Sequence, residues 1–202
     1  MQSPDNAVQV LKLLLERGAE ADATCEIYGP SQTTLCLLVS SSVPAEAGVQ
    51  APLVETLCQA GANPNGLDDD GLPLWTAIWF GYTEAVDALA RAGARVDNVV
   101  FAAALDDVAL IEEYFFPDGR VRDTRTKSAA RIGTHGPALD RPVEYALIYA
   151  VAHGRRRAAE YLLGKSPDLT VTEPVWNNTA LGAARWGGHD DLVRLLERFV
   201  RS

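Results

Sequence analysis

The sequence predicts an all-α fold in which short antiparallel helix pairs stack on one another. Within the stretch 70–97, two apolar stripes have the 3-and-4 spacing of a buried helical face. Gly81 separates them and Gly93 follows the second. Two such short helices cannot bury both stripes alone, so the pair requires neighbouring copies. The copies are present, because the helix-ending phrase recurs as LLLERGAEAD (13–22), LCQAGANPN (57–65) and LARAGARVD (89–97).

These recurring phrases resemble those of the ankyrin repeat family, whose period is about 33 residues and whose T-P-L-H-x-A signature precedes two antiparallel helices. The signature appears here as LPLWTA (72–77) and TALGAA (179–184). The family's Gly-His pair between the helices appears as Gly188-His189 and, with one substitution each, as Gly81-Tyr82 and Gly154-Arg155. The resemblance covers nearly the whole chain. It implies a single domain over 1–202, built as a solenoid of helix pairs with short β-turn fingers.

The first elements are uneven copies of this unit. Residues 1–22 are expected to form only the second helix of a repeat, so this half repeat either caps the array or marks the chain as a fragment of a longer protein. The next repeat, 23–65, contains two stretches rich in small, polar or proline residues. We expect both to be loops, an extended finger at 24–32 and an interhelical loop at 40–50.

The middle of the chain holds the best and the poorest copies. Residues 66–97 form the best-preserved repeat, and 98–119 a short degenerate one in which Asp106 replaces the interhelical glycine, as Asp tolerates in a turn. Residues 120–140 interrupt the pattern, and over 120–131 five basic residues accompany a single acid. A structureless loop of about 20 residues is usually functional or disordered. This basic loop is therefore either a solvated insertion or a contact for an acidic partner surface.

The pattern returns at the C-terminal end. A repeat is predicted over 141–170, where Arg155-Arg156-Arg157 occupies the turn and the start of the second helix. Positive charge near a helix N-terminus is mildly unfavourable. We interpret these arginines as ordinary solvated side chains. The terminal repeat is predicted over 171–202.

Length, charge and cysteine content narrow the class of protein. The 202 residues suit one ordinary domain or a short repeat array, and no apolar run approaches the 18 or so residues of a membrane span. The formal net charge of −9 argues against a general nucleic-acid or anionic-membrane binder and favours a partner with a basic surface. The three cysteines lack C-x-x-C spacing and the N-terminus resembles no secretory signal. We therefore expect free thiols, a cytoplasmic location and a monomer.

No motif for catalysis or cofactor binding stands out. His189 matches the family's turn histidine, which by resemblance ties neighbouring turns together. Asp68-Asp69-Asp70 lacks the spacing of a calcium loop and is interpreted as a solvated acidic finger, and the glycines form no phosphate-binding loop. We predict no enzymatic activity, no cofactor and no metal site.

The resemblance implies that partners contact the finger tips and the exposed positions of the first helices, which together line a concave groove. The two positions before the interhelical glycine are typical contacts, and here they hold Trp79-Phe80, Ala104-Leu105, Ala152-His153 and Trp186-Gly187. Large aromatic side chains are enriched in binding hot spots. Trp75, by contrast, is expected to pack between repeats. The candidate partner-binding residues are Trp79, Phe80, Trp186, His153, Trp176, Asp68, Asp69, Arg120, Arg122 and Arg125.

The function expected from this resemblance is protein–protein recognition without catalysis. The acidic residues Asp68–Asp70 and Glu173 would steer a basic partner, and the aromatic residues would anchor it. Two alternatives stay open. The basic loop 120–131 rather than the groove makes the partner contacts, or the chain is a structural repeat segment of a larger protein.

Overall fold

The computed structural model describes residues 6–26, 32–122, 126–128 and 139–200. Most of this described chain is helical, which confirms the all-α class expected from the sequence. We expected one domain, and the structure groups the chain into two compact units, 1–95 and 96–202. Each unit is described by itself below.

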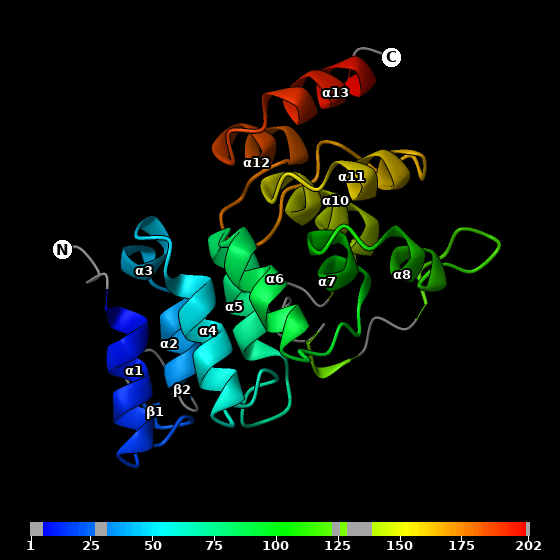
Figure 1. The fold of residues 1–202 in the computed structure, drawn as a ribbon. Helices are drawn as coiled ribbons and strands as arrows, with labels where there is room; N and C mark the ends of the chain where they lie inside the picture. Colours follow the sequence, from blue (N-terminus) through cyan, green and yellow to red (C-terminus); the bar gives the residue numbers. More distant parts are fainter. Residues whose placement is uncertain (1–5, 27–31, 123–125, 129–138, 201–202) are drawn as a thin grey trace. The chain divides into compact units, whose positions relative to one another are not determined.

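The first unit combines helices with one small hairpin (Figure 1). The two strands β1 and β2 pair antiparallel, Thr24 with Thr33 and Cys25 with Gln32. The elements are α1 (Ala7–Glu16), β1 (Thr24–Cys25), β2 (Gln32–Thr33), α2 (Thr34–Val39), α3 (Ser42–Glu46), α4 (Gln50–Gln59), α5 (Leu72–Phe80) and α6 (Thr83–Arg91).

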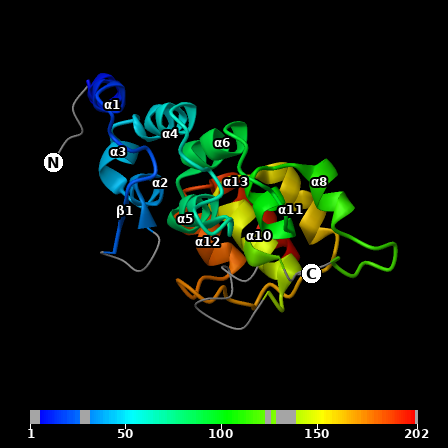
Figure 2. The same ribbon diagram turned by 90° about the horizontal axis from the view of Figure 1, so that it is seen from below.

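The helices of the first unit form two rows. In Figures 1 and 2, α1, α4 and α6 follow one another in one row, and α2 and α5 lie side by side in the other. Helix α5 is apolar on all sides and is buried from Pro73 to Ile78, because α2 and α6 both pack against it. Trp75 is among these buried residues, as the sequence predicted.

The segment 23–65, which was predicted to form a stretched repeat, is more ordered than expected. The strands β1 and β2 lie at the two ends of the expected finger 24–32 and pair with each other as a hairpin. Residues 27–31 lie outside the described chain. The interhelical segment 40–50 is not a plain loop, because residues 42–46 form α3. Pro44 lies within the first turn of this helix, where its missing N–H costs no hydrogen bond. Gln50 holds the insertion in place by donating from Nε2 to the carbonyl oxygens of Leu38 and Ser41.

The second unit is also built of two helical rows. Helix α10 packs against α7 and α12 in one row, while α8 packs against α11 in the other. An exposed ion pair connects Arg156 of α11 with Asp191 of α13. The elements are α7 (Val99–Ala104), α8 (Val108–Glu113), α10 (Pro142–Ala152), α11 (Arg156–Leu163), α12 (Ala180–Trp186) and α13 (Asp190–Val200).

The turn between the two helices of a pair has the same geometry in four places. A residue with positive φ ends the first helix: Gly81 (77°), Asp106 (58°), Gly154 (69°) and Gly188 (72°). The N–H of the next residue donates to a carbonyl five positions earlier in each copy, as from Tyr82 to Ala77 and from His189 to Ala184. The expectation that Asp106 replaces a turn glycine is therefore confirmed.

Successive fingers are joined by a recurring side-chain contact. The carboxylate of Asp22 accepts from the N–H of Asn63, and the Oδ1 of Asn65 accepts from the N–H of Arg95. Asp97 stands at the matching position of the second unit. Its carboxylate accepts instead from the hydroxyls of Thr126 and Ser128, so part of the predicted basic loop takes the place of a finger.

The first and last helices of the described chain both leave apolar side chains exposed. Leu13 and Leu14 of α1 are 49% and 53% exposed, and Phe199 and Val200 of α13 are 45% and 60% exposed. None of the described helices combines the length and apolar character needed to cross a lipid bilayer.

Candidate functional site

The predicted anchors Trp79 and Phe80 lie at the C-terminal end of α5. Both are half-buried, and their rings stack with centroids 5.2 Å apart. The Phe80 ring stacks in turn on Tyr82, at 6.0 Å and an interplanar angle of 5°. Sequence reasoning did not select Tyr82, although it follows the turn glycine directly. The end of α5 therefore presents a continuous row of three aromatic rings.

Trp176, the candidate in the last finger, is 55% exposed. Its backbone is fixed by Glu173, whose side chain is only 2% exposed. The Glu173 carboxylate accepts from the N–H groups of Val175, Trp176 and Asn178 at 2.7–3.0 Å, and from the hydroxyl of Tyr149 at 3.4 Å. The finger therefore holds an exposed ring on an ordered backbone.

This arrangement corrects the role expected of Glu173. A buried carboxylate whose oxygens already accept hydrogen bonds from backbone N–H groups cannot steer a partner. Glu173 is therefore a structural residue of the finger. Burial, and to a smaller extent the charge of this carboxylate, raises the pKa of the Tyr149 hydroxyl. No motif in the stretch E-x-V-W-N-N (173–178) predicted this structural role of Glu173.

Trp186 ends α12 and is the most exposed of the selected aromatic residues, at 62%. The neighbouring Arg185 pairs with Glu197 of α13 at 3.1 Å, which fixes the end of α12 against the last helix. Trp186 occupies the position equivalent to Trp79, two residues before the left-handed turn residue. The structure thus leaves this predicted anchor open to solvent.

His153 is a wrong prediction. It lies one residue before the turn glycine, as expected, but its side chain is only 3% exposed. The end of α10 is enclosed because α7, α11 and α12 all pack against this helix. A partner cannot reach His153 in this structure.

His189 has the geometry of the role that the resemblance implied. Its Nε2 lies 3.1 Å from the carbonyl oxygen of Ala152, one turn away. A Cβ on Gly154 would lie 2.7 Å from the ring, so only glycine fits beneath it. Arg155 makes the corresponding contact with the turn before that, donating from Nε to the carbonyl oxygen of Ala104 at 2.8 Å. The two residues link three successive turns.

The acidic finger divides between exposed and structural carboxylates. Asp68 is exposed, whereas Asp70 is buried and accepts from the N–H of Leu72. Asp69 is exposed but forms an ion pair with Arg95 at 3.0 Å. The finger therefore offers less free negative charge to a partner than three aspartates suggest.

The described start of the basic loop forms a small hairpin after α8. Phe115 and Val121 pair in an antiparallel β-bridge, and the exposed ring of Phe116 lies near the tip of this hairpin. The guanidinium groups of Arg120 and Arg122 lie 5.6 Å and 4.3 Å from the centroid of this ring. Arg120 also binds Asp118, and its N–H groups lower the pKa of that carboxyl. Arg125 lies outside the described residues.

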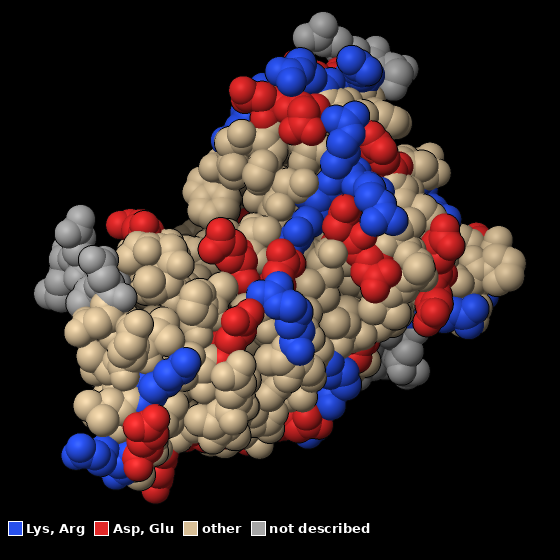
Figure 3. Space-filling model, viewed as in Figure 1, with Lys and Arg blue, Asp and Glu red and all other residues tan. Residues whose placement is uncertain are grey.

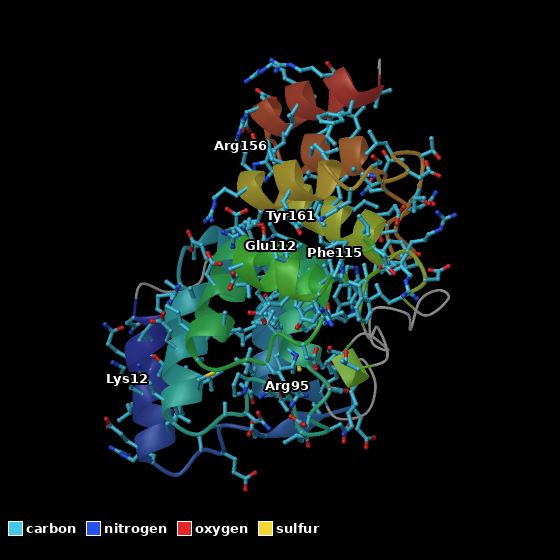
Figure 4. All side chains as sticks on the ribbon, turned by 90° about the vertical axis from the view of Figure 1, so that its right-hand side faces the viewer. Lys12, Arg95, Glu112, Phe115, Arg156 and Tyr161 are labelled. Atoms are coloured by element: carbon cyan, nitrogen blue, oxygen red, sulfur yellow. The ribbon has the colours of Figure 1, made fainter. Side chains whose placement is uncertain are left out.

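The base of this hairpin rests on α11. The ring of Phe115 meets that of Tyr161 edge-on, with the ring centroids 6.0 Å apart, and the ammonium of Lys165 lies over both rings. Phe115 and Tyr161 are labelled in Figure 4. The hairpin is therefore anchored by its buried aromatic residue, while the cations and Phe116 face solvent.

Little in the described chain suggests covalent chemistry. The three cysteines are free. Burial, together with the charge of Asp22, raises the pKa of the Cys58 thiol to about 11, so this thiol is protonated at neutral pH. No group of three or more His, Cys, Asp or Glu side chains within the described ranges could hold a metal ion.

Comparison with known protein families and with characterised proteins found no match to this chain. The resemblance to ankyrin repeats therefore depends on the residues of this chain alone.

Proposed function

We propose that the chain is a non-catalytic recognition module of ankyrin-like helix pairs that binds a protein partner. The observation that carries this proposal is Trp176, an exposed ring on a finger whose backbone is held by the buried Glu173 carboxylate. Trp186, at the end of the following helix, adds a second exposed indole.

The physical reason lies in the cost of exposing and of ordering aromatic side chains. Tryptophan in water forgoes the free energy of burial, about 25 cal/mol per Å² of apolar surface. Binding recovers that free energy, and a backbone that is already ordered adds little entropic cost. Exposed tryptophans on rigid elements are accordingly enriched among residues that dominate interface affinity.

The repeating contacts support the ankyrin-like architecture of the proposal. Gly61 and Gly93 are 32 positions apart and Gly154 and Gly188 are 34 apart, close to the family period of about 33. The interhelical turns share one hydrogen-bond pattern, and the fingers share one side-chain contact. In arrays of this kind a module acts through preformed surfaces, so we propose a monomer that binds through its finger tips and first helices.

The basic hairpin supports a second candidate surface. Phe116 is exposed in this hairpin, and the guanidinium groups of Arg120 and Arg122 lie against its ring. A partner with an acidic surface would meet cation and aromatic ring together. Under this alternative the helix pairs are a structural segment and the hairpin makes the contact.

The two surfaces are separated by matched variants used as bait. One variant carries Trp176→Ala with Trp186→Ala, a second carries Phe116→Ala with Arg122→Ala, and the control carries Phe199→Ala, which removes an exposed aromatic ring from α13. Proteins captured by the unaltered chain from its own cells would be identified, purified and titrated against each variant.

The tryptophan variant is expected to weaken binding of the purified partner about 100-fold or more, because two hot-spot residues of about 2 kcal/mol each are removed. The hairpin variant and the control should bind as the unaltered chain does. Loss of binding in the hairpin variant alone would establish the second candidate, and full binding by all variants would overturn both.

A further inference from the structure

Nearly all of the net negative charge belongs to the first unit. Residues 1–95 contain twelve acidic and four basic side chains, a net charge of −8 out of −9 for the chain. A local excess of this size attracts cations over about one Debye length, near 10 Å at 0.1 M salt. A basic partner would therefore be drawn to this unit.

An open hollow of about 190 Å³ lies in this unit, between the inserted helix α3 and the turn that joins α5 to α6. The described residues that line it are Ala45, Gln50, Gly81, Tyr82, Thr83 and Glu84. Small-molecule sites usually measure 300 Å³ or more, so this hollow has room for about one long side chain.

Both walls of the hollow are held by contacts within this unit, hydrogen bonds on one side and ring stacking on the other. Gln50 is 3% exposed and bonds to two carbonyl oxygens next to α3, which fixes the insertion as one wall. Tyr82 forms the other wall, directly after left-handed Gly81, and stacks on Phe80. The hollow is therefore formed by two ordered segments, the insertion and the turn.

The rim is negative. Glu84 lines the hollow from the first turn of α6 and is exposed. Glu46, exposed at the end of α3, is close enough to Tyr82 for its charge to add to the effect of burial in raising the pKa of that hydroxyl. Figure 3 shows acidic side chains over α3 and over the start of α6.

No lysine or arginine is found among the described residues that line the hollow. Two of the basic residues of this unit form ion pairs elsewhere, Arg91 with Glu55 and Arg95 with Asp69. The chain therefore does not neutralise the rim with these side chains.

We propose that this hollow receives a lysine or arginine side chain from a basic segment of the partner protein. The cation would lie against the Tyr82 ring, close to the carboxylates of Glu84 and Glu46. An aromatic face and two carboxylates favour an ammonium or guanidinium over a neutral side chain. The assignment of the ligand to a protein rests on the proposed function, whereas the preference for a cation rests on the hollow alone.

The test uses the full chain and short synthetic peptides of sequence GSGXGSG, in which X is arginine, lysine or glutamine. Binding is followed by 15N NMR shifts of Tyr82, Thr83 and Glu84. The variants are Glu84→Gln, Glu46→Gln, Tyr82→Ala and Tyr82→Phe. The control Glu16→Gln removes one exposed negative charge from α1 of the same unit.

Arginine and lysine peptides are expected to shift these three signals and the glutamine peptide to leave them unchanged. Glu84→Gln and Glu46→Gln should each weaken binding about two- to fivefold, as should Tyr82→Ala, while Tyr82→Phe retains it. Equal weakening by Glu16→Gln would mean unspecific attraction and would overturn the proposal, as would equal shifts with glutamine. These outcomes are independent of whether Trp176 and Trp186 bind a protein.

Discussion

At the scale of single residues, buried and half-buried polar side chains determine what the surface presents. Glu173 fixes the finger below Trp176, Gln50 fixes α3, and His189 bonds to the turn of the preceding repeat. None of these three side chains needs to contact a partner in order to affect binding. Each places a neighbouring segment by satisfying backbone groups that would otherwise be buried without hydrogen bonds.

Replacing the Glu173 carboxylate by an amide is expected to loosen the last finger. In Glu173→Gln one acceptor oxygen remains for several N–H donors, and the new NH₂ opposes them, so the free energy of unfolding should fall by about 3 kcal/mol. Urea denaturation measures this loss. In 5-fluorotryptophan-labelled protein, the 19F signal of Trp176 should narrow as the ring becomes mobile.

The surface variant Glu197→Gln serves as the control, because it breaks an exposed ion pair with Arg185 and should cost no more than about 1 kcal/mol. If Glu173→Gln proved as stable as this control, the carboxylate would not be what holds the finger.

Residue burial marks the limit of sequence reasoning about the site. Trp176 and Trp186 were selected from their positions in the repeat, and both are exposed. His153 occupies an equally suitable position, yet it is buried because α10 is surrounded by three helices. The position of a residue within the predicted repeat indicates where its Cα lies. Whether its side chain is exposed depends on which neighbouring helices pack over it. That information is not local in the sequence.

At the scale of elements, the turn between paired helices is the best-specified feature. Its left-handed residue is glycine in three copies and Asp106 in the fourth. Asp106 compensates for the strain of positive φ, because its Oδ1 accepts from the N–H of Ala158 at the start of α11 at 2.7 Å. The same residue therefore ends the first helix of one pair and caps a helix of the next.

Substitutions at Asp106 separate the two contributions. Asp106→Ala loses the cap and keeps the unfavourable backbone, so we expect about 2 kcal/mol of destabilisation. Asp106→Asn keeps an acceptor and tolerates positive φ, and it should stay within about 0.5 kcal/mol of the unaltered chain. Asp106→Gly should fall between them. Midpoints of urea denaturation test this order, and a glycine variant less stable than the alanine variant would contradict it.

The elements that sequence reasoning misjudged are the insertions. Residues 40–50 read as a loop because they are small and polar, but 42–46 form α3 once Gln50 supplies hydrogen bonds from a neighbouring helix. Thr126 and Ser128 of the basic loop dock on Asp97, a contact between segments about 30 positions apart. Short helices and docked loops owe their conformation to such tertiary contacts rather than to their own propensities.

At the scale of the whole molecule, charge is distributed unevenly along the chain. The net charge of −9 predicted a basic partner, and the sequence places −8 of it in residues 1–95. The basic loop and the exposed tryptophans both belong to the other unit. The two proposed surfaces are therefore expected to differ in salt dependence, since screening weakens cation binding at the hollow much more than apolar contact at Trp176 and Trp186.

Alkaline pH is expected to destabilise the chain through groups that must stay protonated when folded. Burial and the Glu173 charge raise the pKa of Tyr149 well above its usual value of 10, and burial raises the pKa of Tyr114 to about 12. These hydroxyls ionise more readily in the unfolded chain, so their contribution to stability is complete below pH 10 and is lost as the pH rises above it. For Tyr149, whose side chain is 3% exposed, the loss approaches about 1.4 kcal/mol per pH unit above pH 10. Urea denaturation between pH 8 and pH 11 should show that the free energy of unfolding falls as the pH rises. In Tyr149→Phe this loss should be smaller by about 1.4 kcal/mol at pH 11. Parallel curves for the two proteins would show that Tyr149 ionises equally easily in both states, which its burial against a carboxylate does not allow.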